Sequence, residues 1–222
     1  MSEANPFVGY GTIASGGRFV GREPEITALR RRLYEARSSA ALIGLTRMGK
    51  SSLANKIISE PPDGRTTAGW VNIATAQSGA EVLADILAMC PSPEALHVTF
   101  TTAGAAGGAQ DVPIHGLYRM IRDALLRLRR TGGHLVVVLD EFDSIRHFPD
   151  AREFLNLLRE LVYFPDRIPM AVLAVARRPI DRIEVEAPDV DVEHSALVQR
   201  YGLVDDNGEV WSSEFGAYLR SR

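Results

Sequence analysis

One stretch, residues 40–56 (AALIGLTRMGKSSLANK), constrains the fold of this chain more than any other. Its two glycines, first lysine and first serine match the pattern G-x-x-x-x-G-K-[ST], which forms a phosphate-binding turn. The apolar residues 40–43 before the pattern predict a buried strand, and residues 52–58 after it are compatible with a helix. The pattern therefore lies at a strand-to-helix turn, where backbone N–H groups converge on a phosphate.

The residues of this turn have distinct expected roles. Lys50 is expected to reach the β- and γ-phosphates of a nucleoside triphosphate, and the Ser51 hydroxyl to ligate Mg²⁺. The neighbouring positions complete the phosphate site. The expected nucleotide-binding residues of the turn are Gly44, Thr46, Arg47, Met48, Gly49, Lys50, Ser51 and Ser52.

A second acidic element lies downstream, where the apolar run HLVVVLDE (residues 134–141) ends in two carboxylates. Such a run is typical of a strand in a parallel sheet that is covered on both faces. Asp140 is expected to hold Mg²⁺ through water, and Glu141 to polarise the attacking water. Alone, an acidic strand end is more often a solvated terminus. Together with the turn, it predicts a nucleoside triphosphate site rather than a chance glycine-rich turn.

The other periodic segments predict an α/β, three-layer fold with a mainly parallel central sheet. Two further strands are expected over residues 69–74 and 170–176. A first helix is expected to carry Ile26, Leu29 and Leu33 on its apolar side, and three more are expected over residues 80–89, 115–130 and 151–163. Residues 99–113 are small and polar and predict a flexible surface loop.

Composition narrows the classes of partner and compartment. The formal net charge of −3 gives no global attraction to nucleic acid, and the arginines of residues 115–130 fit a solvated helix face better than a nucleic-acid patch. The single cysteine, Cys90, excludes an internal disulfide and is expected in the core. The chain has no apolar run of 18 residues and no signal-like N-terminus, so a soluble cytoplasmic protein without membrane contact is expected.

The order of several motifs resembles a known family. Asn5-Pro6-Phe7, then FVGREPE (residues 19–25), the phosphate-binding turn and LDEFD (residues 139–143) are similar to the STAND and archaeal-type ATPases of the AAA+ group of P-loop proteins. In that family the hydrophobic-Gly-Arg-Glu box packs beside the adenine. The resemblance therefore implies that Val20, Gly21 and Arg22 hold the base and ribose end of ATP.

The resemblance also implies a sensor of the γ-phosphate at the end of the strand over residues 170–176. Ligands of open α/β sheets lie at the carboxyl ends of the strands, and this strand ends in two arginines. Arg177 is the first choice for the sensor and Arg178 the second, with a solvated strand end as the alternative. The expected catalytic residues are thus Lys50, Glu141 and Arg177.

The C-terminal part departs from the family pattern. We expect an extended arm over residues 1–18, an ATPase domain over residues 19–183, and a linker with a winged-helix-like unit over residues 184–222. The helix, hairpin and helix of that unit resemble the end of a winged-helix domain, whose acidic residues disfavour DNA contact. Too few residues precede it for the helical lid of full-length relatives, which puts hydrolysis by the chain alone in doubt.

The expected function is a nucleotide-dependent switch. ATP with Mg²⁺ would favour assembly with a protein partner or with further copies, and slow hydrolysis to ADP would reset it. The resemblance suggests a role in signalling or defence, in which the ATPase regulates a separate effector. Two alternatives remain open: a DNA-handling AAA+ ATPase of the origin-binding or transposition-regulating type, and a nucleotide-binding scaffold without turnover.

Overall fold

The computed structural model describes residues 13, 19, 21–91, 112–163 and 167–178 of the 222 residues. The predictions for Val20, for the loop up to residue 111 and for the winged-helix-like unit lie outside the described residues, as does nearly all of the N-terminal arm.

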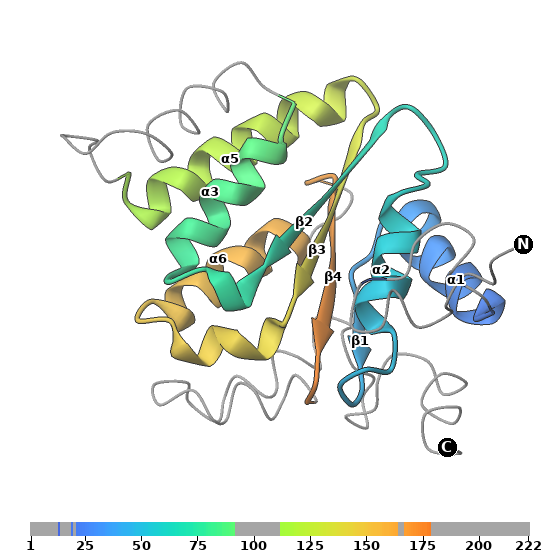
Figure 1. The fold of residues 1–222 in the computed structure, drawn as a ribbon. Coiled ribbons are helices and arrows are strands. Elements are labelled where there is room, and N and C mark those ends of the chain that lie inside the picture. The colour runs from blue at the N-terminus through green and yellow to red at the C-terminus, as the bar shows by residue number, and fades with distance from the viewer. Residues whose placement is uncertain (1–12, 14–18, 20, 92–111, 164–166, 179–222) are drawn as a thin grey trace, which may run out of the picture.

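Within the described part of the chain, four parallel strands form the central sheet in the order β1-β4-β3-β2 (Figure 1). Their bounds are Ala40–Ile43 for β1, Thr66–Asn72 for β2, His134–Asp140 for β3 and Met170–Ala176 for β4. The two inner strands, β3 and β4, are buried at every position, as their unbroken apolar sequences predict.

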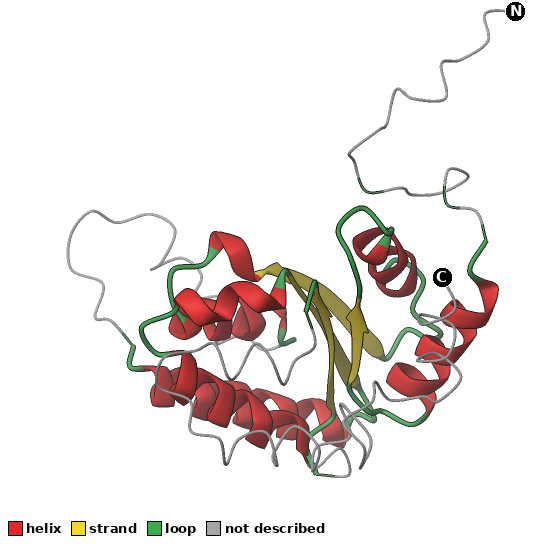
Figure 2. Cartoon of the chain, turned by 90° about the horizontal axis from the view of Figure 1, so that it is seen from below, coloured by secondary structure: helices red, strands yellow, loops and turns green. Residues whose placement is uncertain are grey.

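Helices cover both faces of this sheet and make it the middle of three layers (Figure 2). One face carries α1 (Glu23–Arg30), the π-helical turn η2 (Arg31–Glu35) and α2 (Lys50–Ile58). The other face carries α3 (Gly79–Met89), α5 (Ile114–Arg130) and α6 (Ala151–Tyr163). The α/β three-layer architecture is therefore as predicted.

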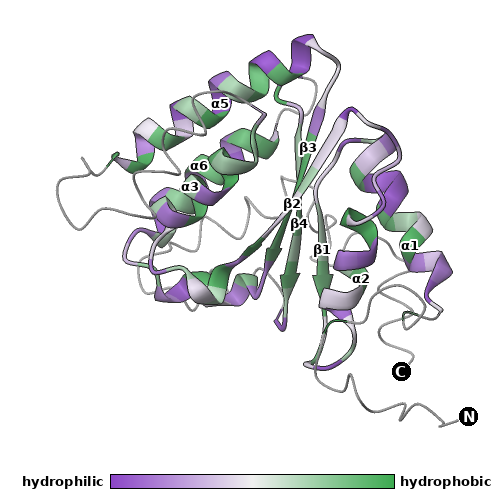
Figure 3. Cartoon of the chain, turned by 45° about the horizontal axis from the view of Figure 1, so that its top comes forward, coloured by the Kyte–Doolittle hydropathy of each residue, from purple (hydrophilic) through white to green (hydrophobic). Residues whose placement is uncertain are grey.

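Alternation along β3 divides the core between the two faces. Leu135, Val137 and Leu139 belong to the cluster with α3, α5 and α6, whereas Val136 and Val138 belong to the cluster with α1 and α2. This alternation follows from the two-residue period of a strand, which sends successive side chains to opposite faces. Figure 3 shows apolar residues along the strands, while the helices carry hydrophilic residues as well.

Three predicted elements have boundaries that differ from the prediction. The strand predicted over residues 69–74 is β2, which begins at Thr66 because its first residues pair with β3 at the half-buried edge of the sheet. It ends at Asn72, whose side chain accepts a hydrogen bond from Ala74 N–H and opens the 3₁₀ turn η3 (Ile73–Thr75). Helix α2 begins at Lys50, two residues earlier than predicted, and Glu141 lies just beyond the end of β3.

The other predicted strands and helices that fall on described residues are confirmed at or within one residue of their bounds. Strands β1 and β4 and helix α6 match residues 40–43, 170–176 and 151–163. Cys90 is buried, as predicted. Among the described residues, no helix combines the length and the apolar character that a membrane span requires.

Candidate functional site

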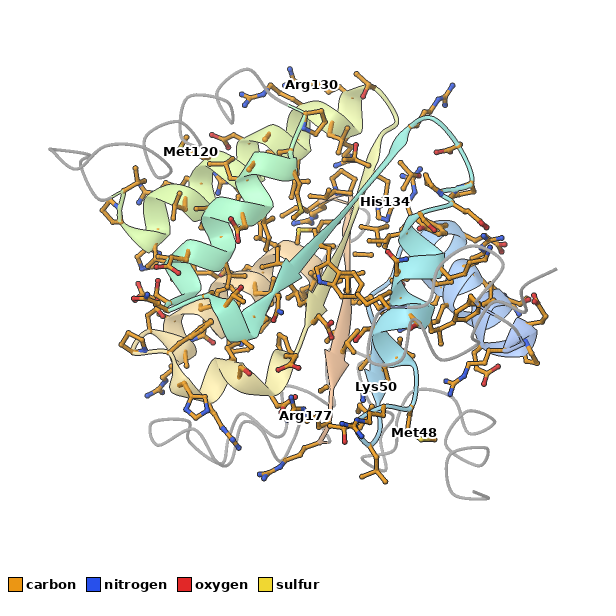
Figure 4. The ribbon with its side chains drawn as sticks, viewed as in Figure 1. Met48, Lys50, Met120, Arg130, His134 and Arg177 are labelled. Atoms are coloured by element: carbon orange, nitrogen blue, oxygen red, sulfur yellow. The ribbon has the colours of Figure 1, made fainter. Side chains whose placement is uncertain are left out.

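Most of the predicted site residues lie at the carboxyl ends of β1, β3 and β4. The loop after β1 begins at Gly44, whose N–H donates to the carbonyl of Ala176 at the end of β4 at 3.3 Å. The 3₁₀ turn η4 (Phe142–His147) follows β3 after Glu141. Figure 4 shows Met48, Lys50 and Arg177 together at this end of the sheet, whereas His134 lies toward the other end. Parallel strands thus bring together segments that lie far apart in the sequence.

The loop between β1 and α2 has the backbone of a phosphate-binding turn. Arg47 and Gly49 have positive φ angles of 64° and 75°, and Gly49 is the residue that caps α2. Helix α2 starts at the following residue, so its first N–H groups face the loop. Lys50 Nζ donates to the carbonyls of Gly44 at 2.7 Å and Leu45 at 2.8 Å, which holds its ammonium group over the loop.

The other loop residues differ in exposure. Thr46, Arg47 and Met48 are exposed at the tip of the loop, whereas Ser51 and Ser52 lie half-buried in the first turn of α2. The Ser51 hydroxyl donates to Asp140 Oδ1 across 3.3 Å, which joins the phosphate loop to the end of β3.

Two charged groups of the site have shifted pKa values with the same main cause. Burial raises the pKa of Asp140, opposed by the hydrogen bonds from Ser51 and from the N–H of Glu141. Burial also lowers the pKa of Lys50, opposed chiefly by the charge of Asp140. Each charge is therefore disfavoured by its own desolvation and partly compensated by its neighbours.

Glu141 adopts a backbone conformation that few residues other than glycine prefer. Its φ and ψ angles are 53° and 43°, in the left-handed region, and its N–H donates to Asp140 Oδ1 at 2.9 Å. This turn directs the chain away from the sheet directly after β3. Backbone strain of this kind is concentrated at functional sites in proteins.

Glu141 forms an ion pair with the arginine that was predicted as the phosphate sensor. Arg177 Nη2 donates to Glu141 Oε1 at 2.9 Å, and the side chains are 49% and 40% exposed. The hydrogen bond to Glu141 raises the pKa of Arg177 above its ordinary value. The structure thus brings together two of the predicted catalytic residues, although the sequence did not indicate that they contact each other.

Asp143 is a residue of the site for which the sequence predicted no role. The residue is 9% exposed, and its Oδ1 accepts the backbone N–H of Arg177 at 3.1 Å. The motif LDEFD contained the only signal, because its last residue is a carboxylate two positions after Glu141.

The hydrophobic-Gly-Arg-Glu box lies against the phosphate loop. Gly21 and Arg22 have consecutive positive φ angles of 81° and 64° before α1, a conformation that costs little at glycine but more at arginine. The guanidinium of Arg22 donates to the carbonyl of Met48 and so ties the box to the tip of the loop. Val20, the third predicted residue of the box, lies outside the described residues.

These residues fit a nucleotide with Mg²⁺. A desolvated carboxylate, Asp140, lies 3.3 Å from the hydroxyl of Ser51, and both are oxygen ligands of the kind that Mg²⁺ binds. Magnesium in such sites usually has only one or two carboxylate ligands and takes further oxygens from phosphates and water. Lys50 and the start of α2 supply positive charge beside the same position.

The sequence matches a known family model over most of its length. Residues 18–173 match the model of the AAA ATPase domain. No protein of curated function is detectably similar to the chain in sequence.

Several solved structures have a similar fold, including the following three. The ORC2 protein of Aeropyrum pernix, solved in ADPNP–ADP complexes, is 19% identical with a TM-score of 0.54, over 80% of this chain and 46% of that one. ORC1 of the same organism, solved in complex with DNA, is 18% identical with a TM-score of 0.55, over 91% and 56%. Cdc6p of Pyrobaculum aerophilum is 13% identical with a TM-score of 0.53, over 85% and 46%. This chain therefore spans about half the length of these proteins.

Proposed function

Because this chain belongs to the AAA ATPase domain family of P-loop proteins, we propose that it binds ATP with Mg²⁺ at the phosphate loop and hydrolyses it slowly, as a switch that regulates a partner. The single observation that carries this proposal is the ion pair between Arg177 and Glu141 at 2.9 Å. It joins the proposed sensor of the γ-phosphate to the proposed catalytic base.

The proposed binding site combines groups from the phosphate loop, the start of α2, the end of β3 and the segment before α1. Lys50 and the backbone N–H groups of the loop would hold the phosphates, and Ser51 and Asp140 would hold Mg²⁺, which neutralises phosphate charge. Gly21 and Arg22, with Val20, would hold the base and ribose. In this role Arg22 acts through its contact with Met48, because that contact keeps the box beside the loop.

The proposed switch depends on the competition for Arg177. Glu141 can accept a proton from a water molecule only where its carboxylate is free to contact that water. In the described structure Arg177 engages this carboxylate. A γ-phosphate would attract the same guanidinium and release Glu141, so that turnover would begin only with a triphosphate in place. Both side chains are well exposed, which makes the pair weak enough to exchange.

Three variants test this function. Lys50→Ala should abolish nucleotide binding, Glu141→Gln should keep binding and lose turnover, and Arg22→Ala should weaken affinity with turnover at saturation unchanged. Calorimetric titration with ATP and phosphate release in the same samples measure these effects. If Glu141→Gln hydrolyses ATP like the parent, the base is not Glu141, and if the parent binds ATP without turnover, the scaffold reading replaces the switch.

The partner of the switch is a separate part of the proposal. ATP with Mg²⁺ would favour assembly with a protein partner or with further copies of the chain, in a STAND-like signalling or defence role. A winged-helix-like unit over residues 184–222 is part of this proposal, as is the division into an arm (1–18) and an ATPase domain (19–183). Light scattering with and without ATP and Mg²⁺ measures assembly. An unchanged molar mass with tight ATP binding would contradict self-assembly.

A DNA-handling role is the second candidate, because ORC1 of Aeropyrum pernix was solved in complex with DNA and has this fold. Helix α5 also carries five exposed arginines: Arg119, Arg122, Arg127, Arg129 and Arg130. Binding to duplex DNA that requires ATP and weakens steeply with salt would favour this role over the switch. Fluorescence anisotropy at two salt concentrations, with and without ATP, measures it.

A further inference from the structure

The pairing between β3 and β4 ends before β4 itself does. The register between the two strands runs as far as Leu139 and Ala174, and the left-handed conformation of Glu141 then turns the chain away. The N–H of Arg177 consequently has no acceptor on the backbone of β3. Asp143 Oδ1 accepts this N–H at 3.1 Å and takes the place of a strand carbonyl.

Arg177 is therefore held at two points on the β3 side. Its backbone is bonded to Asp143, and its guanidinium is bonded to Glu141 at 2.9 Å. Asp143 is only 9% exposed and its bond to the Arg177 N–H is partly buried, so this bond is better shielded from water than the exposed ion pair. The backbone bond to Asp143 fixes the position of the Arg177 main chain, from which the flexible side chain extends.

We propose that Asp143 is a positioning residue, which holds the end of β4 so that the Arg177 guanidinium lies beside Glu141 without nucleotide and reaches the γ-phosphate when ATP is bound. The inference rests on the proposed function in that Arg177 and Glu141 are the residues proposed to act in ATP hydrolysis. Asp143 itself contacts neither phosphate nor water in this proposal. It acts through the backbone of Arg177.

The charge of Asp143 is a second way in which it could act. This charge contributes to the raised pKa of Arg177 and opposes the lowered pKa of Lys50, in each case as a lesser cause. Asparagine keeps an oxygen acceptor for the Arg177 N–H but removes the charge. Asp143→Asn and Asp143→Ala therefore separate the hydrogen bond from the electrostatic effect.

Strand β4 offers a matched control. Ser39 Oγ accepts the backbone N–H of Val172 at 3.0 Å, near the other end of the same strand. Ser39→Ala removes a bond of the same kind, from a side-chain oxygen to a β4 amide. It leaves the carboxyl end of the strand in place.

The first measurement is amide hydrogen exchange at Arg177 in the nucleotide-free chain. Asp143→Ala should raise the exchange rate of this amide about tenfold or more, since a hydrogen bond to a charged acceptor is lost. Asp143→Asn should raise it less, and Ser39→Ala should not change it. An unchanged rate in Asp143→Ala, or an equal rise in Ser39→Ala, would overturn the proposal.

The second measurement separates positioning from a general loss of structure. Asp143→Ala should lower kcat for ATP about tenfold or more and leave the dissociation constant of ADP unchanged, because ADP lacks the phosphate that Arg177 would sense. Asp143→Asn should restore most of kcat. Equal losses in the two variants, or weaker ADP binding in Asp143→Ala, would overturn the proposal. If the parent neither binds nor hydrolyses ATP, the proposed function fails, while the exchange experiment still decides the placement of Arg177.

Discussion

Replacement of Arg177 by glutamine separates the contribution of its ion pair to stability from its proposed contribution to turnover. The pair joins Nη2 to Glu141 Oε1 at 2.9 Å, but the two side chains are 49% and 40% exposed. Exposed pairs of this kind contribute about 0.2–1 kcal/mol because water screens them. Arg177→Gln should therefore lower the free energy of unfolding by less than about 1 kcal/mol.

The same substitution should have a much larger effect on turnover. Removing one group that stabilises developing charge in a transition state lowers kcat about 10²- to 10³-fold. Urea unfolding followed by circular dichroism gives the first quantity, and release of phosphate at saturating ATP gives the second. A kcat within about threefold of the parent, or a loss of several kcal/mol in stability, would refute the reasoning. A large loss in Arg178→Gln with none in Arg177→Gln would transfer the sensor role to Arg178.

Three further predictions concern burial. Gly79→Ala should destabilise the chain by about 1–3 kcal/mol, because the new Cβ would lie 2.2 Å from Phe154 Cβ. Gly64→Ala, with no atom within 4 Å of the new Cβ, is the control, and equal urea midpoints for the two would contradict the packing argument. Burial lowers the pKa of His134, so its protonation should destabilise the fold increasingly as pH falls below about 6.5. His134→Gln should reduce this loss of stability, which urea unfolding above and below about pH 6.5 would measure. An unchanged pH dependence in the variant would contradict the role of His134. Burial raises the pKa of Asp140, so the fold is stabilised while this carboxyl is protonated and loses that stability as pH rises. Asp140→Asn, which carries no charge, should therefore resist urea better than the parent at neutral pH without nucleotide. A less stable variant would contradict this.

The sequence predicted the buried parts of the fold better than the edges. Strand β4 is apolar at all seven positions and buried at each, so its run of residues defined it without further context. The threonines that begin β2 gave no such signal, because this edge strand is half-buried and its start depends on pairing with His134 and its neighbours in β3. Tertiary pairing outweighed local pattern there.

The part of the candidate site that the sequence motifs cover was predictable. Lys50, Ser51 and Asp140 lie together as their patterns indicate, and Ser51 contacts Asp140 directly. The pairing of Arg177 with Glu141 was not predictable, because it depends on the left-handed turn at Glu141 and on a side-chain rotamer. Neither the left-handed turn nor the rotamer can be predicted from the pattern of residues. The roles of all these residues in catalysis remain predictions.

The position of β4 in the sheet has a consequence for the order in which the protein is made. Among the described strands, β4 is the last in the sequence, yet it lies between β1 and β3 and is the only one of them that pairs with β1. A nascent chain that has not yet released residue 176 from the ribosome carries both the phosphate-binding and the acidic motif, but β1 has no partner to hold it beside β3. The long sequence separation between β1 and β4 makes this closing step slow relative to local folding. The ability to bind nucleotide should therefore appear late and abruptly during synthesis, once β4 has paired with both β1 and β3.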